Sequence, residues 1–437
     1  MFMRICRVLI CATALISLFA CSNDKVLPEG NRLSVLTPVS SIKPDVVNGG
    51  NRIKISEKKN ITSWEQAEFN SQHLIPNIDI NKINNLVWKA SFGKGTSKRD
   101  VLMAKPLIVA NSIFVLDAEA LLSSYKLTDG SLQWTLKLEA KNKNIRDTSL
   151  KGVGIVYGNG NIYVATGYGD IYSINAIDGK INWQKHLEMP IRIAPMFANS
   201  YLYIQSADNK LITLNAKTGD DVWKYDISAE NTTLMGSSGL SFVPNLNLLL
   251  VSFPGGDLQA FNAILGMPLW NDVLVSNRQA YSSTFLNSIK ASPVIVDDVV
   301  YAMGSSNILV AIDVRSGLRI WEKEIGGVNT PLINGNTMYV VSNSKDLVAL
   351  DRNNGNVLWA TPMDLGKNSA DISIYQPLMV NGRIMVALSN GEIYYFMPQT
   401  GKVVEKQNME MDLNFAPVFA NGYSVFVSPD AEIYVYK

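Results

Sequence analysis

A short motif, in which a glycine stands four residues before a tryptophan, recurs along most of this chain. The clearest copy runs from Val310 to Trp321, with a turn that Asp313 begins and Gly317 closes between two β-prone runs. Aspartate can hydrogen-bond the backbone two residues on, and glycine takes a positive φ without steric cost, so this copy predicts a strand–turn–strand unit. The copies are Gly130/Trp134, Gly179/Trp183, Gly219/Trp223, Gly266/Trp270, Gly317/Trp321, Gly355/Trp359 and Gly401/Glu405, the last without the indole ring.

Successive copies are 38 to 51 residues apart. A period of about 40–50 residues, β in character and without 3.6-residue apolar periodicity, is typical of propeller blades and not of helical repeats. We therefore predict an all-β fold, a single β-propeller of four-stranded blades. The repeated tryptophans and glycines are interpreted as structural residues that pack each blade on the next, because a buried aromatic ring covers a large area (roughly 150–250 Å²).

The two ends of the repeat region are incomplete in complementary ways. Leu86–Phe92 is a strand that contains Trp88 but follows no blade, whereas the segment from Pro417 to Tyr436 has three strands and no tryptophan. Pairing the two segments gives the last blade its fourth strand and removes two open sheet edges. With this N- and C-terminal strand closure the propeller has eight blades, and we place it at residues 83–437.

Prolines and Asn-Gly pairs punctuate the blades. Proline cannot donate to a ladder, so it suits the first residue of a strand, and most blades open with one. Asn-Gly between apolar runs is a strong hairpin signal. The prolines are Pro106, Pro195, Pro293, Pro331, Pro377 and Pro417, and the pairs are Asn334–Gly335, Asn381–Gly382 and Asn421–Gly422.

The first residues predict export. Arg4 and Arg7 precede Val8–Ala20, an apolar stretch of 13 residues. This stretch is too short for a membrane-spanning helix, and the charge before it fits a signal peptide at residues 1–20.

The segment Leu18–Cys21 resembles the lipobox of bacterial lipoproteins, from which Phe19 departs. The resemblance implies cleavage before Cys21 and acylation of this cysteine, for example with palmitate, which would anchor the protein to a membrane. Ser22 stands where aspartate would favour the inner membrane, so the implied location is the periplasmic face of the outer membrane. The alternative is an ordinary cleaved signal with an incidental cysteine.

Residues 21–82 are interpreted as a lipid-anchored linker that is partly packed on the ring. They are rich in Asn, Lys, Ser, Pro and Gly and lack sustained periodicity. Gly30–Leu36 and Trp64–Gln66 are the segments that we expect to lie against the propeller. His73 is weighed as a ligand, but a single histidine without partners is usually structural.

Composition excludes several classes of function. The net charge is +1, and it is −1 without residues 1–20, which argues against a nucleic-acid partner. Cys6, Cys11 and Cys21 are the three cysteines, so the folded body has no disulfide, thiolate nucleophile or cysteine metal site. The two histidines, His73 and His186, are far apart in sequence. We therefore predict no metal site.

Three further motifs are assigned to loops and turns. Gly93–Ser97 superficially suggests phosphate binding, but it lacks the glycine spacing and the Gly-Lys-Ser/Thr order of a P-loop. The pairs Asp220–Asp221 and Asp297–Asp298 lack the alternating oxygen ligands of a calcium loop and stand at or beside turns.

The segments Ala216–Trp223 and Asp313–Trp321 resemble the tryptophan-docking repeat that PQQ-dependent dehydrogenases share with the BamB lipoproteins of the β-barrel assembly (BAM) machinery. With its lipobox, eight blades and short length, the chain is similar to BamB, and Pro28–Leu36 and Trp64–Gln66 resemble the alphaproteobacterial branch. The resemblance implies a non-enzymatic scaffold that binds the POTRA domains of BamA and other BAM components. Such a scaffold would assist insertion of outer-membrane proteins and would also hold extended client strands.

The family's partner-binding loop, between the third and fourth complete repeats, carries a Leu-x-Leu-Arg-Gly pattern. The matching segment here is Thr232–Gly236, in which Leu234 and Gly236 match, Thr232 and Met235 depart, and the arginine is absent. The resemblance thus implies Leu234, Met235 and Gly236 as partner-binding residues. The alternative is a loop that only packs on the ring. A second family patch, acidic elsewhere, reads Ser288–Pro293 here, with Lys290 in place of an acid.

Two other functions stay open. One is a PQQ-type quinoprotein or ligand-binding propeller, and the other is an interaction propeller with a different envelope partner. Quinoprotein alcohol dehydrogenases, as a family, are longer, and many carry adjacent cysteines and carboxylates around calcium and the quinone. This chain has no adjacent cysteine pair, so we assign no catalytic residue and no cofactor.

Overall fold

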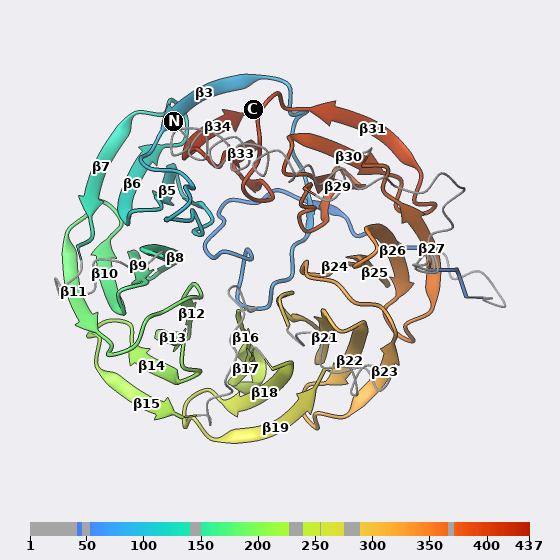
Figure 1. Ribbon diagram of the computed structural model, residues 1–437, viewed down its shortest axis with the longest axis horizontal. Helices are drawn as coiled ribbons and strands as arrows, with labels where there is room; N and C mark the ends of the chain where they lie inside the picture. Colours follow the sequence, from blue (N-terminus) through green and yellow to red (C-terminus); the bar gives the residue numbers. More distant parts are fainter. Residues whose placement is uncertain are drawn as a thin grey trace, which may run out of the picture. The chain divides into compact units, whose positions relative to one another are not determined.

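The apolar runs between the turn motifs form strands, and the strands form eight blades around a ring (Figure 1). The structure is a computed structural model that describes residues 42–45, 53–139, 150–226, 239–253, 255–274, 289–365 and 371–437. Residues 41–437 form one unit, separate from residues 1–40. The predicted signal peptide, Cys21 and the Gly30–Leu36 segment lie outside the described residues.

Blades 1 to 4 follow one another along the chain, each with its strands ordered from the centre outward. A 3-10 turn, η3 (Pro244–Leu246), joins the first two strands of blade 4. The strands are, in blade 1, β4 (Leu107–Val109), β5 (Ser112–Leu116), β6 (Leu121–Lys126) and β7 (Leu132–Lys137); in blade 2, β8 (Gly152–Gly158), β9 (Asn161–Thr166), β10 (Asp170–Asn175) and β11 (Ile181–His186); in blade 3, β12 (Met196–Ala198), β13 (Tyr201–Gln205), β14 (Leu211–Asn215) and β15 (Asp221–Tyr225); and in blade 4, β16 (Leu240–Val243), β17 (Leu248–Ser252), β18 (Asp257–Asn262) and β19 (Pro268–Val273).

Blades 5 to 8 repeat the pattern with two changes. Blade 7 gains β2 (Asn77–Ile78) and β1 (Lys58–Lys59) on its inner side, and blade 8 takes its outer strand from β3 (Leu86–Ser91). The other strands are, in blade 5, β20 (Val294–Val296), β21 (Val299–Gly304), β22 (Ile308–Asp313) and β23 (Arg319–Lys323); in blade 6, β24 (Leu332–Asn334), β25 (Thr337–Val341), β26 (Asp346–Asp351) and β27 (Val357–Pro362); in blade 7, β28 (Leu378–Val380), β29 (Arg383–Ala387), β30 (Glu392–Phe396) and β31 (Val403–Asn408); and in blade 8, β32 (Val418–Ala420), β33 (Tyr423–Val427) and β34 (Glu432–Tyr436).

This arrangement confirms the predicted eight-bladed propeller and its closure. β3 pairs antiparallel with β34, with Trp88 opposite Val435, so segments from the two ends of the ring share one blade. The blade-opening prolines differ slightly from expectation, because each lies one residue before the innermost strand and not at its first position.

Burial follows the strand's place in the blade. The middle strands pack against neighbouring blades on both faces, so they are nearly continuous buried apolar runs, as in β25. Most outer strands alternate between exposed and half-buried residues, and in β7 and β19 the tryptophan takes a half-buried position.

Each tryptophan of an outer strand docks on the turn glycine of the next blade. Gly317 has a φ of 72°, and a Cβ placed on it would lie 2.6 Å from the ring of Trp270. The Nε1 of Trp270 donates to the carbonyl of Val314 at 2.9 Å. The same Nε1-to-carbonyl bond joins Trp88 to Leu127, Trp134 to Ala176, Trp183 to Ala216, Trp223 to Ala263, Trp321 to Arg352 and Trp359 to Pro398.

The joint between blades 7 and 8 is built differently. Its outer strand carries Glu405, which pairs with Arg383 at 2.8 Å instead of docking on a turn. No turn connects β34 to β3, because they lie far apart in the chain. At this joint the segment that leads into β3 lies beside the outer strand of blade 7, where a turn lies at the other joints. The side-chain amide of Gln407 donates to the carbonyl of Ile83 in that segment.

Residues 53–82, here called the strap, cross one face of the ring. They contain β1 and β2 and carry Trp64, which is 1% exposed and packs against Phe69 and Phe419. The strap bonds to the inner strand, or to the residue next to it, in every blade: at Ile108 in blade 1, Tyr157 in blade 2, Phe197 in blade 3, Phe242 in blade 4, Ile295 in blade 5, Asn334 in blade 6, Val380 in blade 7 and Asn421 in blade 8.

Candidate functional site

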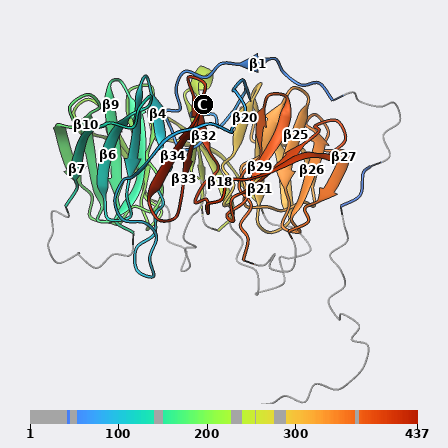
Figure 2. The same ribbon diagram turned by 90° about the horizontal axis from the view of Figure 1, so that it is seen from above.

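The ring has two faces with different coverings. Each inner strand begins after an inter-blade loop and ends at a tight turn, as β12 does between Pro195 and the Asn199–Ser200 turn. The strap reaches the turn ends, where Asn381 and Asn421 donate their backbone N–H groups to it. Figure 2 shows the strap with β1 across that side of the ring. We call this side the strap face and the opposite side the loop face.

A cavity of about 200 Å³, the channel cavity, lies at the centre of the ring. Strap residues Gln66–Glu68 and His73 line it, together with residues that precede or begin the inner strands of blades 1 to 5. Because those residues stand at the loop ends of the inner strands, the cavity opens to the loop face and the strap forms its floor. The blade residues that carry polar or charged side chains are Lys105, Arg192, Lys290 and Ser292.

Cations outnumber acids in this cavity. Lys105 forms an ion pair with Glu68 of the strap, and both side chains are mostly buried. The second oxygen of Glu68, Oε2, is buried and has no hydrogen-bond partner among the described residues. Arg192 and Lys290 make no ion pair with any residue that the structure describes. The cavity therefore carries two positive charges that the described part of the chain leaves unmatched.

His73 is a buried contact between the strap and two blades. It is 7% exposed, and its Nδ1 lies 2.9 Å from the carbonyl of Pro293 and 3.1 Å from Oγ of Ser241. Burial lowers the pKa of His73 below 6.5; the Lys105 charge lowers it further, while Glu68 and the Pro293 carbonyl raise it. The imidazole is therefore neutral at pH 7, and its contacts match the structural interpretation of this residue.

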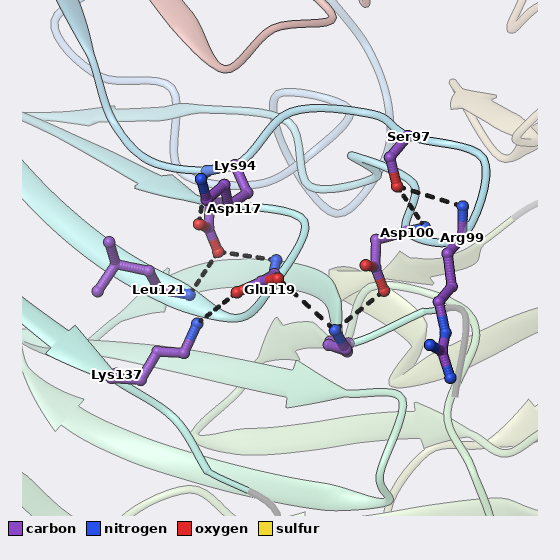
Figure 3. A network of polar contacts seen from close by, with 9 residues as sticks. Lys94, Ser97, Arg99, Asp100, Asp117, Glu119, Leu121 and Lys137 are labelled. Atoms are coloured by element: carbon purple, nitrogen blue, oxygen red, sulfur yellow. Dashed lines mark hydrogen bonds and ion pairs between the residues drawn. The ribbon is translucent and has the colours of Figure 1, made fainter. Parts of the chain in front are cut away.

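A polar network holds the loop that leads to Lys105 (Figure 3). Asp117 accepts backbone N–H bonds from Lys94, Glu119 and Leu121 at 2.8, 2.9 and 2.6 Å. Lys151 pairs with Asp100 at 3.1 Å. The carboxylates are thus used to fix the loop, and the Gly93–Ser97 segment is part of it, since Ser97 Oγ accepts from the N–H groups of Arg99 and Asp100.

The other predicted residues divide into two groups. Leu234, Met235 and Gly236 lie outside the described residues. The aspartate pairs occupy the places assigned to them: Asp297 and Asp298 have positive φ in a turn and pair with Arg352 and Arg315.

Lys105 and Arg192 are not among the site residues predicted from the sequence. The available signal was a cation within three residues before the proline that opens a blade, which occurs at Lys105–Pro106, Arg192–Pro195 and Lys290–Pro293. Only the ring geometry shows that these positions converge on one cavity.

Comparison with known proteins identifies the family of this chain. The family described as "Outer membrane protein assembly factor BamB" matches residues 118–361, which is more than half of the 437 residues. The chain belongs to this family. Curated members of the same name include one from Yersinia pestis, 24% identical over 356 residues (80% of this chain and 88% of that protein), and one from Escherichia coli K12, 24% identical over 365 residues (82% and 90%).

Solved structures agree on the fold. BamB from Moraxella catarrhalis matches with a TM-score of 0.66 and 18% identity, covering 80% of this chain and 100% of that chain. The quinohemoprotein alcohol dehydrogenase ADHIIG from Pseudomonas putida HK5 matches with a TM-score of 0.67 and 14% identity, covering 86% and 80%. At these identities the likeness shows the propeller alone.

Within the described ranges, no three His, Cys, Asp or Glu side chains gather where they could hold a metal. The strap residues Glu68 and His73 line the channel cavity, whose volume is about 200 Å³.

Helices long and apolar enough to cross a membrane do not occur in the part that the structure describes.

Proposed function

We propose that this protein is the BamB-type scaffold of an outer-membrane β-barrel assembly complex. It binds the POTRA domains of BamA and other BAM components, assists insertion of outer-membrane proteins and catalyses no reaction. An acylated Cys21 anchors it to the periplasmic face of the outer membrane, residues 1–20 are the signal peptide, and residues 21–82 link the anchor to the ring. The family match over residues 118–361 is the observation that carries the proposal.

The geometry supports a scaffold that presents its loop face. The strap bonds to all eight blades and covers the opposite face, so that face is less available to a partner. β15 ends at Tyr225 and β16 begins at Leu240, and the predicted contact residues Leu234, Met235 and Gly236 fall between them in the sequence.

The proposal is tested by binding of the BamA POTRA domains. We expect the full-length protein to co-purify with them, and its depletion to lower the amount of outer-membrane porins. No co-purification together with unchanged porin levels would reject the scaffold function.

A double variant addresses the predicted contact. Leu234→Asp with Met235→Asp should weaken POTRA binding at least tenfold, because two apolar contacts become charged, while the melting temperature stays unchanged. The matched control is Leu265→Asp with Leu318→Asp, at side chains that are 59% and 70% exposed in turns at the strap ends of the blades. Equal binding by the two double variants would remove the 234–236 segment from the interface.

The alternative function, a quinone-binding propeller, is tested by measuring whether the protein retains PQQ. Adding PQQ and Ca²⁺ to the purified protein should leave no quinone absorbance on the protein after gel filtration. Stoichiometric retention of the quinone would favour the alternative.

A further inference from the structure

We propose that the channel cavity receives a carboxylate side chain, from an aspartate or glutamate that a protein partner presents on the loop face, and that Arg192 and Lys290 bind it. The inference rests on the proposed function, because it specifies the chemistry of the partner at that face.

The charges of the cavity point to an anion. Lys105 is matched by Glu68, whereas Arg192 and Lys290 have no acidic partner among the described residues. Arg192 is half-buried, and Lys290 is exposed. A guanidinium binds a carboxylate through two parallel N–H bonds, and an ammonium adds a second charge-assisted bond.

The size and shape of the cavity favour a single side chain. Strap residues Gln66–Glu68 and His73 line the cavity together with the blades. Its volume is about 200 Å³, and an apolar cavity of about 150 Å³ accepts a benzene ring. One acidic side chain fits, with room for a few waters, whereas an extended polyanion does not. The net charge of +1 is near neutral, so the protein has no extended positive field that would attract a polyanion.

The position of the cavity favours a protein as the source of the carboxylate. Gly239 and Leu240 line it and directly follow the segment that contains Leu234, Met235 and Gly236. Lys290 and Ser292 line it as well and belong to the second predicted contact patch, Ser288–Pro293. A partner that engages the second patch therefore contacts residues that line the cavity itself.

The test compares two charge-reversed variants of the full chain. Arg192→Glu with Lys290→Glu should weaken binding of the BamA POTRA domains at least tenfold and reduce the dependence of binding on salt. The control is Lys94→Glu with Lys98→Glu, which makes the same change in net charge at two exposed residues of the loop that precedes blade 1. The control should lose less than threefold, and both variants should keep the wild-type melting temperature. Replacing single acids of the POTRA domains by lysine should then restore binding to the Arg192/Lys290 variant at one position.

The outcomes separate this inference from the function on which it rests. If Arg192→Glu with Lys290→Glu binds the POTRA domains as tightly as the wild type, the carboxylate pocket is overturned and the scaffold function is kept. No wild-type binding at all rejects both. The last measurement is titration of the protein with glutarate and with inorganic phosphate. If either anion binds with a submillimolar Kd, and Arg192→Glu with Lys290→Glu abolishes that binding but leaves POTRA binding intact, the cavity is a site for free small anions. That result overturns the proposal that a protein partner supplies the carboxylate.

Discussion

At the scale of single residues, the turn glycines meet two separate demands. Gly317 has a φ of 72°, which an L-residue adopts only with strain, and its Cα faces the ring of Trp270 at a distance that leaves no room for a Cβ. Gly422 shares the first demand, with a φ of 76°, but nothing lies within 4 Å of the position that its Cβ would take. The two glycines therefore separate backbone strain from blade packing.

Replacing each of these glycines by alanine should show that difference. Gly422→Ala should cost about 1–2 kcal/mol of unfolding free energy through backbone strain. Gly317→Ala should cost about 1–3 kcal/mol more, since the added methyl group displaces the Trp270 indole. Urea denaturation of both variants measures the difference, and equal losses would show that the indole gives way without cost.

At the scale of elements, seven joints between blades follow one design and the eighth does not. Trp359 is 8% exposed and donates to the carbonyl of Pro398 in blade 7. At the next position of the pattern, Glu405 pairs with Arg383 of its own blade, and the two side chains are 47% and 49% exposed. The ring closes there through the β3–β34 ladder and the strap segment, so the outer strand of blade 7 has no turn glycine on which a tryptophan could dock.

Truncation at these two joints should have very different costs. Trp359→Ala should lower the unfolding free energy by about 3–5 kcal/mol, as expected for a buried aromatic. Glu405→Ala should cost less than about 1 kcal/mol, because exposed ion pairs contribute little. Differential scanning calorimetry of both variants is the measurement. A large loss at Glu405 would mean that its ion pair stabilises blade 7 far more than an exposed pair usually does.

At the scale of the whole molecule, the strap ties the blades together from the centre. His73 contributes to this tie because it contacts Ser241 of blade 4 and Pro293 before blade 5. Glu68 and Lys105 are the charged groups whose fields act on it, and burial keeps its pKa below 6.5. Protonation of His73 would place a charge in a buried position against both blades.

The stability of the ring should therefore fall in mild acid. Below pH 6.5 the unfolded chain protonates this histidine while the folded state does not, so the unfolded state binds more protons and stability decreases as the pH falls. The contribution is at most about 1.4 kcal/mol per pH unit, and it ends at the folded-state pKa. Urea denaturation between pH 7.5 and 5.5 should give a flatter profile for His73→Asn than for the wild type. Parallel profiles would show that His73 is not the responsible group.

The sequence predicts the repeat architecture because a turn glycine, followed four residues on by a tryptophan, recurs in blade after blade. Gly317, four residues before Trp321, predicts a turn and a strand wherever it occurs, and Trp88 at the start complements the missing strand after Tyr436. Blade number, blade composition and closure follow from these positions without knowledge of distant contacts.

The tertiary structure alone decided what the centre of the ring contains. The strap has no periodicity, since it makes a different set of hydrogen bonds to each of the eight blades, so its path could not be inferred from residues 53–82 themselves. Lys105, Arg192 and Lys290 are far apart in sequence, and only a closed ring brings the loop ends of their blades to one cavity. The sequence by itself determined the propeller and its closure, because the turn glycine and the tryptophan recur at a regular spacing. The cavity and its charge depend on where the strap and the loop ends of the inner strands lie in space, which no single repeat encodes.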